Sequence, residues 1–390
     1  MMAITLLSVS ACFVSSDMPI EYGKPDSEKA ILIGLARDSR FRSEILDSIE
    51  ELEALTVSAG ATVIGKRVQV KPHPNPAFYI GKGLVEEMRE QLQETEGNCV
   101  IFDDPLTPAQ QRNLEEALEA KVIDRSILIL DIFATRARTA AARLQVELAQ
   151  LEYTLPRLTG AWVHFSRQYG RIGSKGPGET QLETDRRQVR QKIDHLKQKL
   201  ERLGVQRATQ RAGRQNLFKV AMVGYTNAGK STLFNLLTKS DVQTADMLFT
   251  TLDSTTRVMA SGYPCHVVFS DTVGFIKKLP HQLVESFKST LEEVSLANLL
   301  LVVVDCSDER FEERTRQTHQ VLGEIGAEKV PYLMVYNKID MHPEFVAPPN
   351  HGEKSFLVSA REKLGLSALK AEIVAASEQF LRGKNHPKHL

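Results

Sequence analysis

One short segment restricts the possible folds of this chain more than any other sequence feature. Residues 224–231 are Gly-Tyr-Thr-Asn-Ala-Gly-Lys-Ser, which match the pattern GxxxxGK[ST], and they directly follow the apolar run 218–223. In this pattern the glycines let backbone N–H groups wrap phosphates, the lysine answers the phosphate charge, and the final hydroxyl binds Mg²⁺. The segment therefore predicts a buried strand, a phosphate-binding loop and a helix, in that order, within an α/β domain.

A second motif, Asn-Lys-Ile-Asp at 337–340, follows the apolar run 330–336 and matches NKxD. A carboxylate at Asp340 can accept hydrogen bonds from both N1 and the N2 amino group of guanine, whereas adenine offers no such pair of donors. Downstream, the apolar stretch 355–358 ends in Ser359 and Ala360, an SA motif whose backbone supports the guanine carbonyl. These motifs predict GTP as the nucleotide.

Two further motifs lie between the phosphate-binding loop and Asn337. Residues 271–274 are Asp-Thr-Val-Gly after a predicted strand at 266–270, and residues 248–253 are Leu-Phe-Thr-Thr-Leu-Asp. Asp271 would hold Mg²⁺ through water and the Gly274 N–H would sense the γ-phosphate, so hydrolysis would release both segments. The order of the four motifs predicts a Ras-like P-loop GTPase domain at 216–382. Its expected GTP contacts are Gly224, Tyr225, Thr226, Asn227, Ala228, Gly229, Lys230, Ser231, Thr232, Phe249, Thr250, Thr251, Leu252, Asp253, Asp271, Thr272, Val273, Gly274, Asn337, Lys338, Ile339, Asp340, Ser359, Ala360 and Arg361.

The residue after Gly274 bears on catalysis. It is Phe275, whereas Ras-type enzymes place there a glutamine that orients the attacking water. A phenyl ring cannot orient water. We therefore identify no general base in this chain and expect slow hydrolysis that a partner accelerates.

The first 135 residues alternate between apolar runs and helical stripes. Apolar runs predict strands at 30–35, 61–70, 98–102 and 126–132, and periodicity predicts helices at 41–59, after residues 81–83 and from 107 onward. This alternation predicts a small parallel α/β subdomain at 29–135. Residues 71–76 hold three prolines and should form a loop. Gly81-Lys82-Gly83 suits a glycine turn better than an anion site. Residues 1–28 are expected to be a disordered leader, or to precede a true start at Met18.

A different period marks residues 136–215. Apolar residues recur at steps of three and four along 137–155 and, with one longer step, along 182–203, which predicts an antiparallel helical hairpin. The block holds 17 Lys and Arg against seven Asp and Glu, a net charge of +10, while the remainder holds 32 against 42, a net charge of −10. The zero net charge of the whole chain is thus the sum of a basic helical block and an acidic remainder. This asymmetry favours nucleic acid as a partner.

The connection at 156–178 is longer than the packing of two helices requires, and it interleaves cations with aromatic rings. Rings stack on unpaired bases and cations meet phosphates, so the composition suits RNA, with packing of the rings on the hairpin as the alternative. Together with two arginines of the second helix, the expected RNA contacts are Arg157, Trp162, Arg167, Tyr169, Arg171, Lys175, Arg186 and Arg187.

Composition bounds the cellular setting. No apolar run approaches the roughly 20 residues that span a bilayer, and the four cysteines form no CxxC pair. A reducing cytosol suits such a chain, with peripheral association at a membrane as a further option. We expect a monomer with a basic tail at 383–390.

Several segments resemble one family. The stretch 176–187, Gly-Pro-Gly-Glu-Thr-Gln-Leu-Glu-Thr-Asp-Arg-Arg, is the most specific, and segments 34–38, 101–104, 110–114, 122–125, 144–150, 155–160 and 224–231 add to it. From about residue 30 to 380 the chain is similar to the HflX family of GTPases. The resemblance implies an N-terminal α/β subdomain, a helical hairpin and a G domain of the Obg and HflX class, with the hairpin loop near the peptidyl-transferase region of the large ribosomal subunit.

The resemblance also implies ribosome splitting under stress, a GTPase that the ribosome stimulates, and Mg²⁺ held by Ser231, Thr251 and, through water, Asp271. Thr251 rather than Thr250 is implied because the family uses the threonine before Leu-Asp. Asn227 stands where tRNA-modifying relatives bind K⁺, so K⁺ is a candidate second cofactor, and shaping of the loop is the alternative. The hairpin loop departs from the family pattern at Gly170, where members carry a glycine cluster.

The expected function is therefore a GTP-hydrolysing factor of the large ribosomal subunit that splits or rescues ribosomes. The alternative is a regulatory GTPase that acts on protein or membrane-surface effectors through the hairpin.

Overall fold

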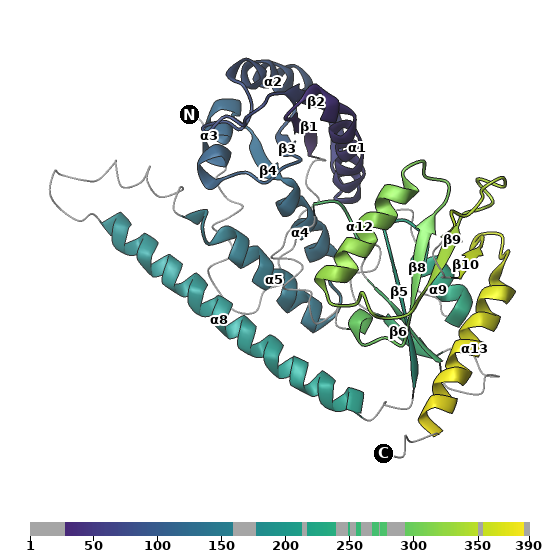
Figure 1. Ribbon diagram of the computed structural model, residues 1–390. Helices are drawn as coiled ribbons and strands as arrows, with labels where there is room; N and C mark the ends of the chain where they lie inside the picture. The colour runs from purple at the N-terminus through teal and green to yellow at the C-terminus, as the bar shows by residue number, and fades with distance from the viewer. Residues whose placement is uncertain are drawn as a thin grey trace.

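The computed structural model describes residues 28–158, 177–212, 217–238, 249, 255–258, 267–272, 274–278, 293–349 and 354–385. These residues form an N-terminal α/β subdomain, two long helices and a second α/β domain (Figure 1). The predicted leader, the tail beyond 385 and most of the connection at 156–178 lie outside the described residues. No helix in the described ranges is both long and apolar enough to cross a membrane.

The N-terminal sheet has the strand order β2-β1-β3-β4, and every pair is parallel. Its strands are β1 (Lys29–Ala36), β2 (Thr62–Val70), β3 (Cys99–Phe102) and β4 (Lys121–Asp124). The two central strands are continuous apolar runs because both faces are covered. On one face Ala30 and Leu32 pack with α1 (Arg42–Ser58) and α4 (Arg125–Arg136). On the other, Ile31 and Ile33 pack with α2 (Lys82–Thr95) and α3 (Pro108–Leu118).

Local chemistry explains where these helices begin. The Thr107 hydroxyl and the Gln110 side chain form a capping box at α3, with Pro108 in the first turn. The Gly81 N–H at the start of α2 is taken by the Gln69 side chain at 2.8 Å, which favours a turn over an anion site. Residues 71–76 form the loop that their prolines predict.

The strand predicted at 126–132 is wrong, because these residues belong to α4. The helix is buried on most of its surface, including Leu128, Ile129 and Leu130 in succession, so its sequence lacks the polar positions that reveal a helical period. The fourth strand is instead the short β4 just before it, and the Asp124 side chain, accepting from the Ile127 N–H at 3.1 Å, caps the helix.

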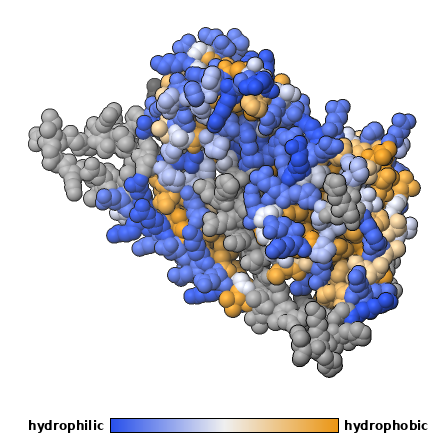
Figure 2. All heavy atoms as spheres, in the orientation of Figure 1, coloured by the Kyte–Doolittle hydropathy of each residue, from blue (hydrophilic) through white to orange (hydrophobic). Residues whose placement is uncertain are grey.

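The basic block forms two helices, α5 (Ala140–Thr154) and α8 (Pro177–Ala212), which lie side by side as expected. Leu148 packs against Val189, Ile193 and Leu196 of α8. The visible outer face of α8 is hydrophilic, and an apolar stripe follows its inner side (Figure 2). The seam therefore lies where the three- and four-residue steps predict it.

The second domain is built on a six-stranded sheet of order β10-β9-β8-β5-β7-β6, in which only the β6–β7 pair is antiparallel. The strands are β5 (Phe218–Gly224), β6 (Thr255–Val258), β7 (Val267–Asp271), β8 (Leu299–Asp305), β9 (Tyr332–Asn337) and β10 (Ser355–Leu357). Helices α9 (Lys230–Thr238) and α13 (Leu366–Asn385) cover one face, and α12 (Phe311–Glu324) covers the other. This arrangement confirms the predicted Ras-like fold.

Candidate functional site

The predicted phosphate-binding loop connects β5 to α9, and two glycines allow its path. Gly224 has φ +148°, and a Cβ there would lie 2.2 Å from the Val303 carbonyl oxygen of β8. Gly229 has φ +86°, and a Cβ there would lie 2.2 Å from Nδ2 of Asn337. Any side chain at either position would collide with a neighbour, so the loop can pass close to β8 and Asn337 only with glycine.

Lys230 supplies the positive charge of this loop. Its Nζ donates to the backbone carbonyls of Gly224 at 3.1 Å and Tyr225 at 2.6 Å. Burial lowers the pKa of Lys230 to about 8, and the nearby Asp271 only partly offsets this. The Thr226 hydroxyl is also buried, with no hydrogen-bond partner in the part of the chain that the structure describes. An anion that entered this loop would stabilise the charged form of Lys230, which burial disfavours, and would accept a hydrogen bond from the Thr226 hydroxyl.

Ser231 and Asp271 come together as the motifs predict. The Ser231 hydroxyl donates to Oδ2 of Asp271 at 2.8 Å, which joins the first turn of α9 to the end of β7. A hydroxyl beside a carboxylate, next to a phosphate-binding loop, is an all-oxygen donor set that fits Mg²⁺. Thr272 plays a different part, since its hydroxyl donates to the Met222 carbonyl at 2.6 Å and so ties β7 to β5.

The NKxD and SA segments meet at the ends of β9 and β10. Asn337 donates to the Ala228 carbonyl at 2.9 Å and accepts from the Ala360 N–H at 2.9 Å, so it holds the phosphate-binding loop and the SA segment together. Asp340 accepts from the Ser359 hydroxyl at 2.6 Å. Asn337 is thus a structural tie, and Ser359 holds the Asp340 carboxylate at the same end of the sheet.

Lys338, the second residue of the NKxD segment, pairs with a side chain of the neighbouring strand. Lys338 has φ +67° and forms an ion pair with Asp305 at 2.7 Å. This aspartate was missed by sequence reasoning because it matches no motif, although it ends the strand β8. The pair fixes the Lys338 side chain at the carboxyl end of β8.

Phe275 and Gly274 lie beside the phosphate-binding loop. The Phe275 N–H donates to the Gly224 carbonyl at 3.1 Å, and its carbonyl accepts from the Thr226 N–H at 2.9 Å. The Phe275 ring is buried in the core under α12. It faces away from solvent and cannot orient a water molecule, as the sequence indicated.

The other predicted site residues divide into three groups. Thr232 lies in α9, Ile339 packs against the core under α12, and Arg361 is exposed beyond the SA segment. Asn227 is exposed in the loop with φ +59°, a conformation that asparagine tolerates better than most residues. Thr250, Thr251, Leu252, Asp253 and Val273 lie outside the described residues, as do Trp162, Arg167, Tyr169, Arg171 and Lys175.

Three arginines among the expected RNA contacts lie in described residues, and the contacts of Arg157 differ from those of the other two. Arg186 and Arg187 lie on α8, and neither has an ion-pair partner among the described residues. Arg157 instead stacks 3.4 Å from the ring centroid of Tyr153 and donates to the Leu106 carbonyl at 2.8 Å. These contacts tie the end of α5 to the N-terminal subdomain, so Arg157 has structural partners within the chain.

Comparison with known families covers most of the chain. Residues 46–134 match the family described as GTP-binding GTPase N-terminal, and residues 136–214 match GTP-binding GTPase Middle Region. Residues 219–338 match the family described as 50S ribosome-binding GTPase.

Several relatives bear the name GTPase HflX. One from Flavobacterium psychrophilum is 48% identical over 316 residues, which is 81% of this chain and 76% of the relative. Another from Escherichia coli K12 is 48% identical over 305 residues, or 77% and 71%. Among solved structures, SsGBP in complex with GDP is similar in fold, with a TM-score of 0.51, 24% identity, and coverage of 90% of this chain and 99% of that one.

Proposed function

Because the chain belongs to the HflX family of GTPases, we propose that it is a GTP-hydrolysing factor that acts on the large ribosomal subunit and splits or rescues ribosomes under stress. The observation that carries the proposal is the assembly of Lys230, Ser231, Asp271 and Asp340 at one edge of the sheet.

Each part of the site has a separate task in nucleotide binding. The backbone of residues 224–231 and Lys230 would hold the phosphates, and phosphate charge would return the Lys230 pKa toward its ordinary value. Asp340 would accept the two guanine donors. Mg²⁺ held by Ser231, Thr251 and, through water, Asp271 would neutralise charge that develops on the phosphates. An additional K⁺ at Asn227 is the candidate second cofactor.

The side chain of Phe275 determines the rate of GTP hydrolysis that we expect. With its ring in the core, the chain offers no side chain at that position to orient the attacking water. We therefore propose that hydrolysis is slow in the free protein and that the ribosome accelerates it by ordering the two switch segments or by adding polar groups.

The basic helix α8 supports binding to ribosomal RNA. Lys192 and Lys197 of α8 pair with Glu147 and Glu152 of α5 at 2.7 and 2.8 Å, whereas Arg186 and Arg187 lie nearer the start of α8. We propose that these arginines contact rRNA phosphates, together with the loop residues predicted from the sequence.

The test is co-sedimentation of the full chain with isolated large subunits, using a non-hydrolysable GTP analogue, combined with GTP turnover. Association should require the analogue and weaken as salt rises. The double variant Arg186→Ala/Arg187→Ala should reduce the salt dependence by about two counterions. Lys192→Ala/Lys197→Ala is the matched control, since it removes the same charge from side chains already paired with α5.

Equal losses in the two double variants would refute the assignment of Arg186 and Arg187. Absence of nucleotide-dependent co-sedimentation would refute the ribosomal role and favour a protein or membrane effector.

A further inference from the structure

The turn that follows β8 lies beside the predicted nucleotide site. Asp305 ends β8 and faces Asn337 in the register of the β8–β9 pair. The Cys306 N–H donates to the Asn337 carbonyl at 3.0 Å, so the turn is fastened to the start of the NKxD segment. Asp305 also lines a cavity of about 10 Å³ together with Thr226 and Ala228 of the phosphate-binding loop. The Asp305 carboxylate therefore lies near both motifs, although it belongs to neither.

The Asp305 carboxylate is held in one orientation. Its Oδ1 accepts from the Ser307 N–H at 3.0 Å and from the Ser307 hydroxyl at 2.6 Å. These bonds leave Oδ2 for the ammonium group of Lys338, which lies 2.7 Å away. The aspartate side chain is 14% exposed and the lysine side chain 25%, so the pair is partly shielded from water. Because one partner is already fixed, the pair loses less side-chain freedom than an ordinary surface pair.

The backbone also directs the Lys338 side chain. Lys338 has φ +67°, which non-glycine residues seldom adopt without contacts that hold them. On one side of it Asn337 donates to a carbonyl of the phosphate-binding loop, and on the other Asp340 accepts from the SA segment. The methylene stem of Lys338 therefore begins between the phosphate-binding loop and Asp340 and ends at Asp305.

The proposed nucleotide would span the same region. With its phosphates on residues 224–231 and its base on Asp340, its sugar and ring would pass the Lys338 stem. Lysine methylenes pack on an apolar surface while the charged head stays with a polar partner. Asp305 supplies that partner. Since it also neutralises the ammonium group, Lys338 would add little to the attraction of phosphates, which falls to Lys230.

We infer that Asp305 is a positioning residue for base recognition, because its ion pair holds the Lys338 stem against the bound nucleoside and so keeps the guanine ring in line with both oxygens of Asp340. The inference rests on the proposed binding of a guanine nucleotide at this site. A ring that was free to tilt would reach the carboxylate with one donor more readily than with two, since a bidentate contact demands a fixed geometry. Asp305 would thus contribute to selection among purine bases.

The test compares dissociation constants of the full chain for GDP and IDP, measured by competition with a fluorescent GDP. Inosine keeps the N1 proton but lacks the 2-amino group, so IDP offers Asp340 one donor instead of two. The wild type should bind GDP more tightly by about tenfold or more, since the missing donor would pair with a charged group. Asp305→Asn keeps the acceptor for Ser307 but loses the charge, and should lower this preference by about three- to fivefold, the scale of a partly exposed ion pair.

Lys338→Met breaks the same pair from the other side and should lower the preference for GDP to a similar extent. Because Asp305 acts through Lys338, the double variant Asp305→Asn/Lys338→Met should lose no more than Lys338→Met alone. Asp305→Glu retains the charge and should keep more of the preference than Asp305→Asn. The ratio of the constants for GDP and a non-hydrolysable GTP analogue should stay the same in all of these variants, since the phosphate-binding loop is untouched.

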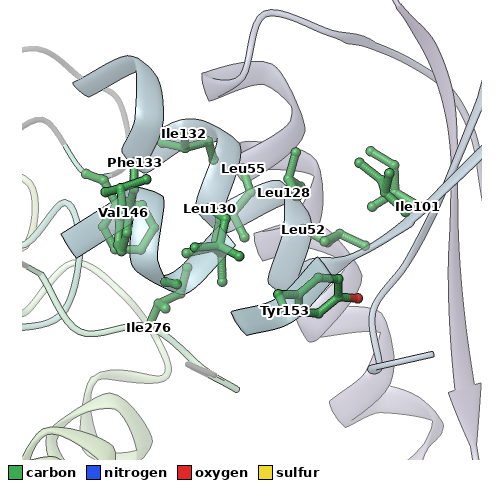
Figure 3. Packing of buried hydrophobic residues seen from close by; sticks show 14 of the residues in the cluster. Leu52, Leu55, Ile101, Leu128, Leu130, Ile132, Phe133, Val146, Tyr153 and Ile276 are labelled. Atoms are coloured by element: carbon green, nitrogen blue, oxygen red, sulfur yellow. The ribbon is translucent and has the colours of Figure 1, made fainter. Parts of the chain in front are cut away.

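Two variants serve as controls. Asp308→Asn removes the same charge from the same turn, where the Asp308 carboxylate pairs with Arg310 at 3.7 Å and with Arg314. Ile101→Val removes a methyl group from the buried cluster that Figure 3 shows, and should lower the midpoint of chemical denaturation. Both variants should keep the wild-type preference for GDP over IDP, so neither a lost charge nor lost stability alone would account for the effect.

A wild-type preference in Asp305→Asn and in Lys338→Met, with GDP still bound tightly, would overturn the inference and leave the proposed function intact. A loss in the double variant beyond that of Lys338→Met would also overturn it, because Asp305 would then act independently of the lysine. If Asp305→Asn does not fold, Lys338→Met and Asp305→Glu decide the question. Failure of the wild type to bind GDP, or equal binding of GDP and IDP, would instead overturn the proposed guanine site.

Discussion

The two sheets of this protein carry polar residues at the carboxyl ends of their parallel strands but satisfy them differently. At the N-terminal sheet, Asp103 and Asp104 receive Arg125 and Lys278, and Asp124 receives the Tyr153 hydroxyl at 2.5 Å. At the second sheet, Lys230 donates to two backbone carbonyls and has a pKa lowered to about 8 by burial. At the edge of the N-terminal sheet, which we call the closed edge, the chain matches its own charges. The edge of the second sheet, which we call the open edge, holds a charge that an anion would match.

This difference teaches how to distinguish a ligand site from a domain contact. Both edges lie where ligands bind in open α/β sheets, so topology alone would propose two sites. The two edges differ in whether the chain satisfies its own buried charges. A buried charge that the chain itself satisfies indicates an internal contact, whereas a buried charge that the chain satisfies poorly indicates a site for an external partner.

Replacement of Arg125 should have the largest effect on the closed edge. This side chain is 2% exposed and pairs with both Asp103 and Glu51. Arg125→Met would leave the buried Asp103 and the partly buried Glu51 with too few cations, and we expect the free energy of unfolding to fall by about 3–5 kcal/mol. Chemical denaturation of the full chain, followed by circular dichroism, measures this change.

The control for this variant is Arg382→Met. Arg382 is 85% exposed and pairs with Glu378 at 4.0 Å, so its loss should cost at most about 0.5 kcal/mol. If both variants lost the same stability, the edge around Asp103 would not be a buried charge network.

At the open edge we expect a smaller effect, in which nucleotide affinity depends on pH. Below pH 8 Lys230 is charged and ready for phosphate, whereas above it the free protein increasingly holds the neutral amine. Because bound phosphate favours the charged form, nucleotide binding should take up a proton as pH rises past 8, and affinity should fall by at most about tenfold per pH unit. Calorimetric titration with GDP at pH 7 and near pH 9, each in two buffers of different ionisation enthalpy, measures the uptake. Proton uptake that does not grow between these pH values would contradict the assignment.

Sequence reasoning located the open edge because chemistry fixes residue types there. Gly224, Gly229, Lys230 and Asp271 can be replaced by few other residues without loss of the loop or its charge. It failed at α4, since a helix that is buried on most of its surface shows no polar period. Helix and strand cannot be told apart in such a run without its neighbours in space.

The closed edge could not be predicted for a different reason. Lys278 and Asp103 are 175 residues apart, and Tyr225 and Glu51 are 174 apart. Neither lysine nor aspartate in those segments matches a motif of nucleotide binding, and only the fold brings them together. Asp103 was visible in the sequence as part of the stretch 101–104, but nothing there indicated its partner.

Backbone hydrogen exchange of the full chain, compared between GDP and a non-hydrolysable GTP analogue, tests the relation between the two edges most directly. Both nucleotides should protect residues 229–231, because both fill the phosphate-binding loop. Neither should protect residues 102–104, because the chain itself pairs Asp103 and Asp104 with Arg125 and Lys278. Protection of residues 102–104 comparable to that of residues 229–231 would contradict the account.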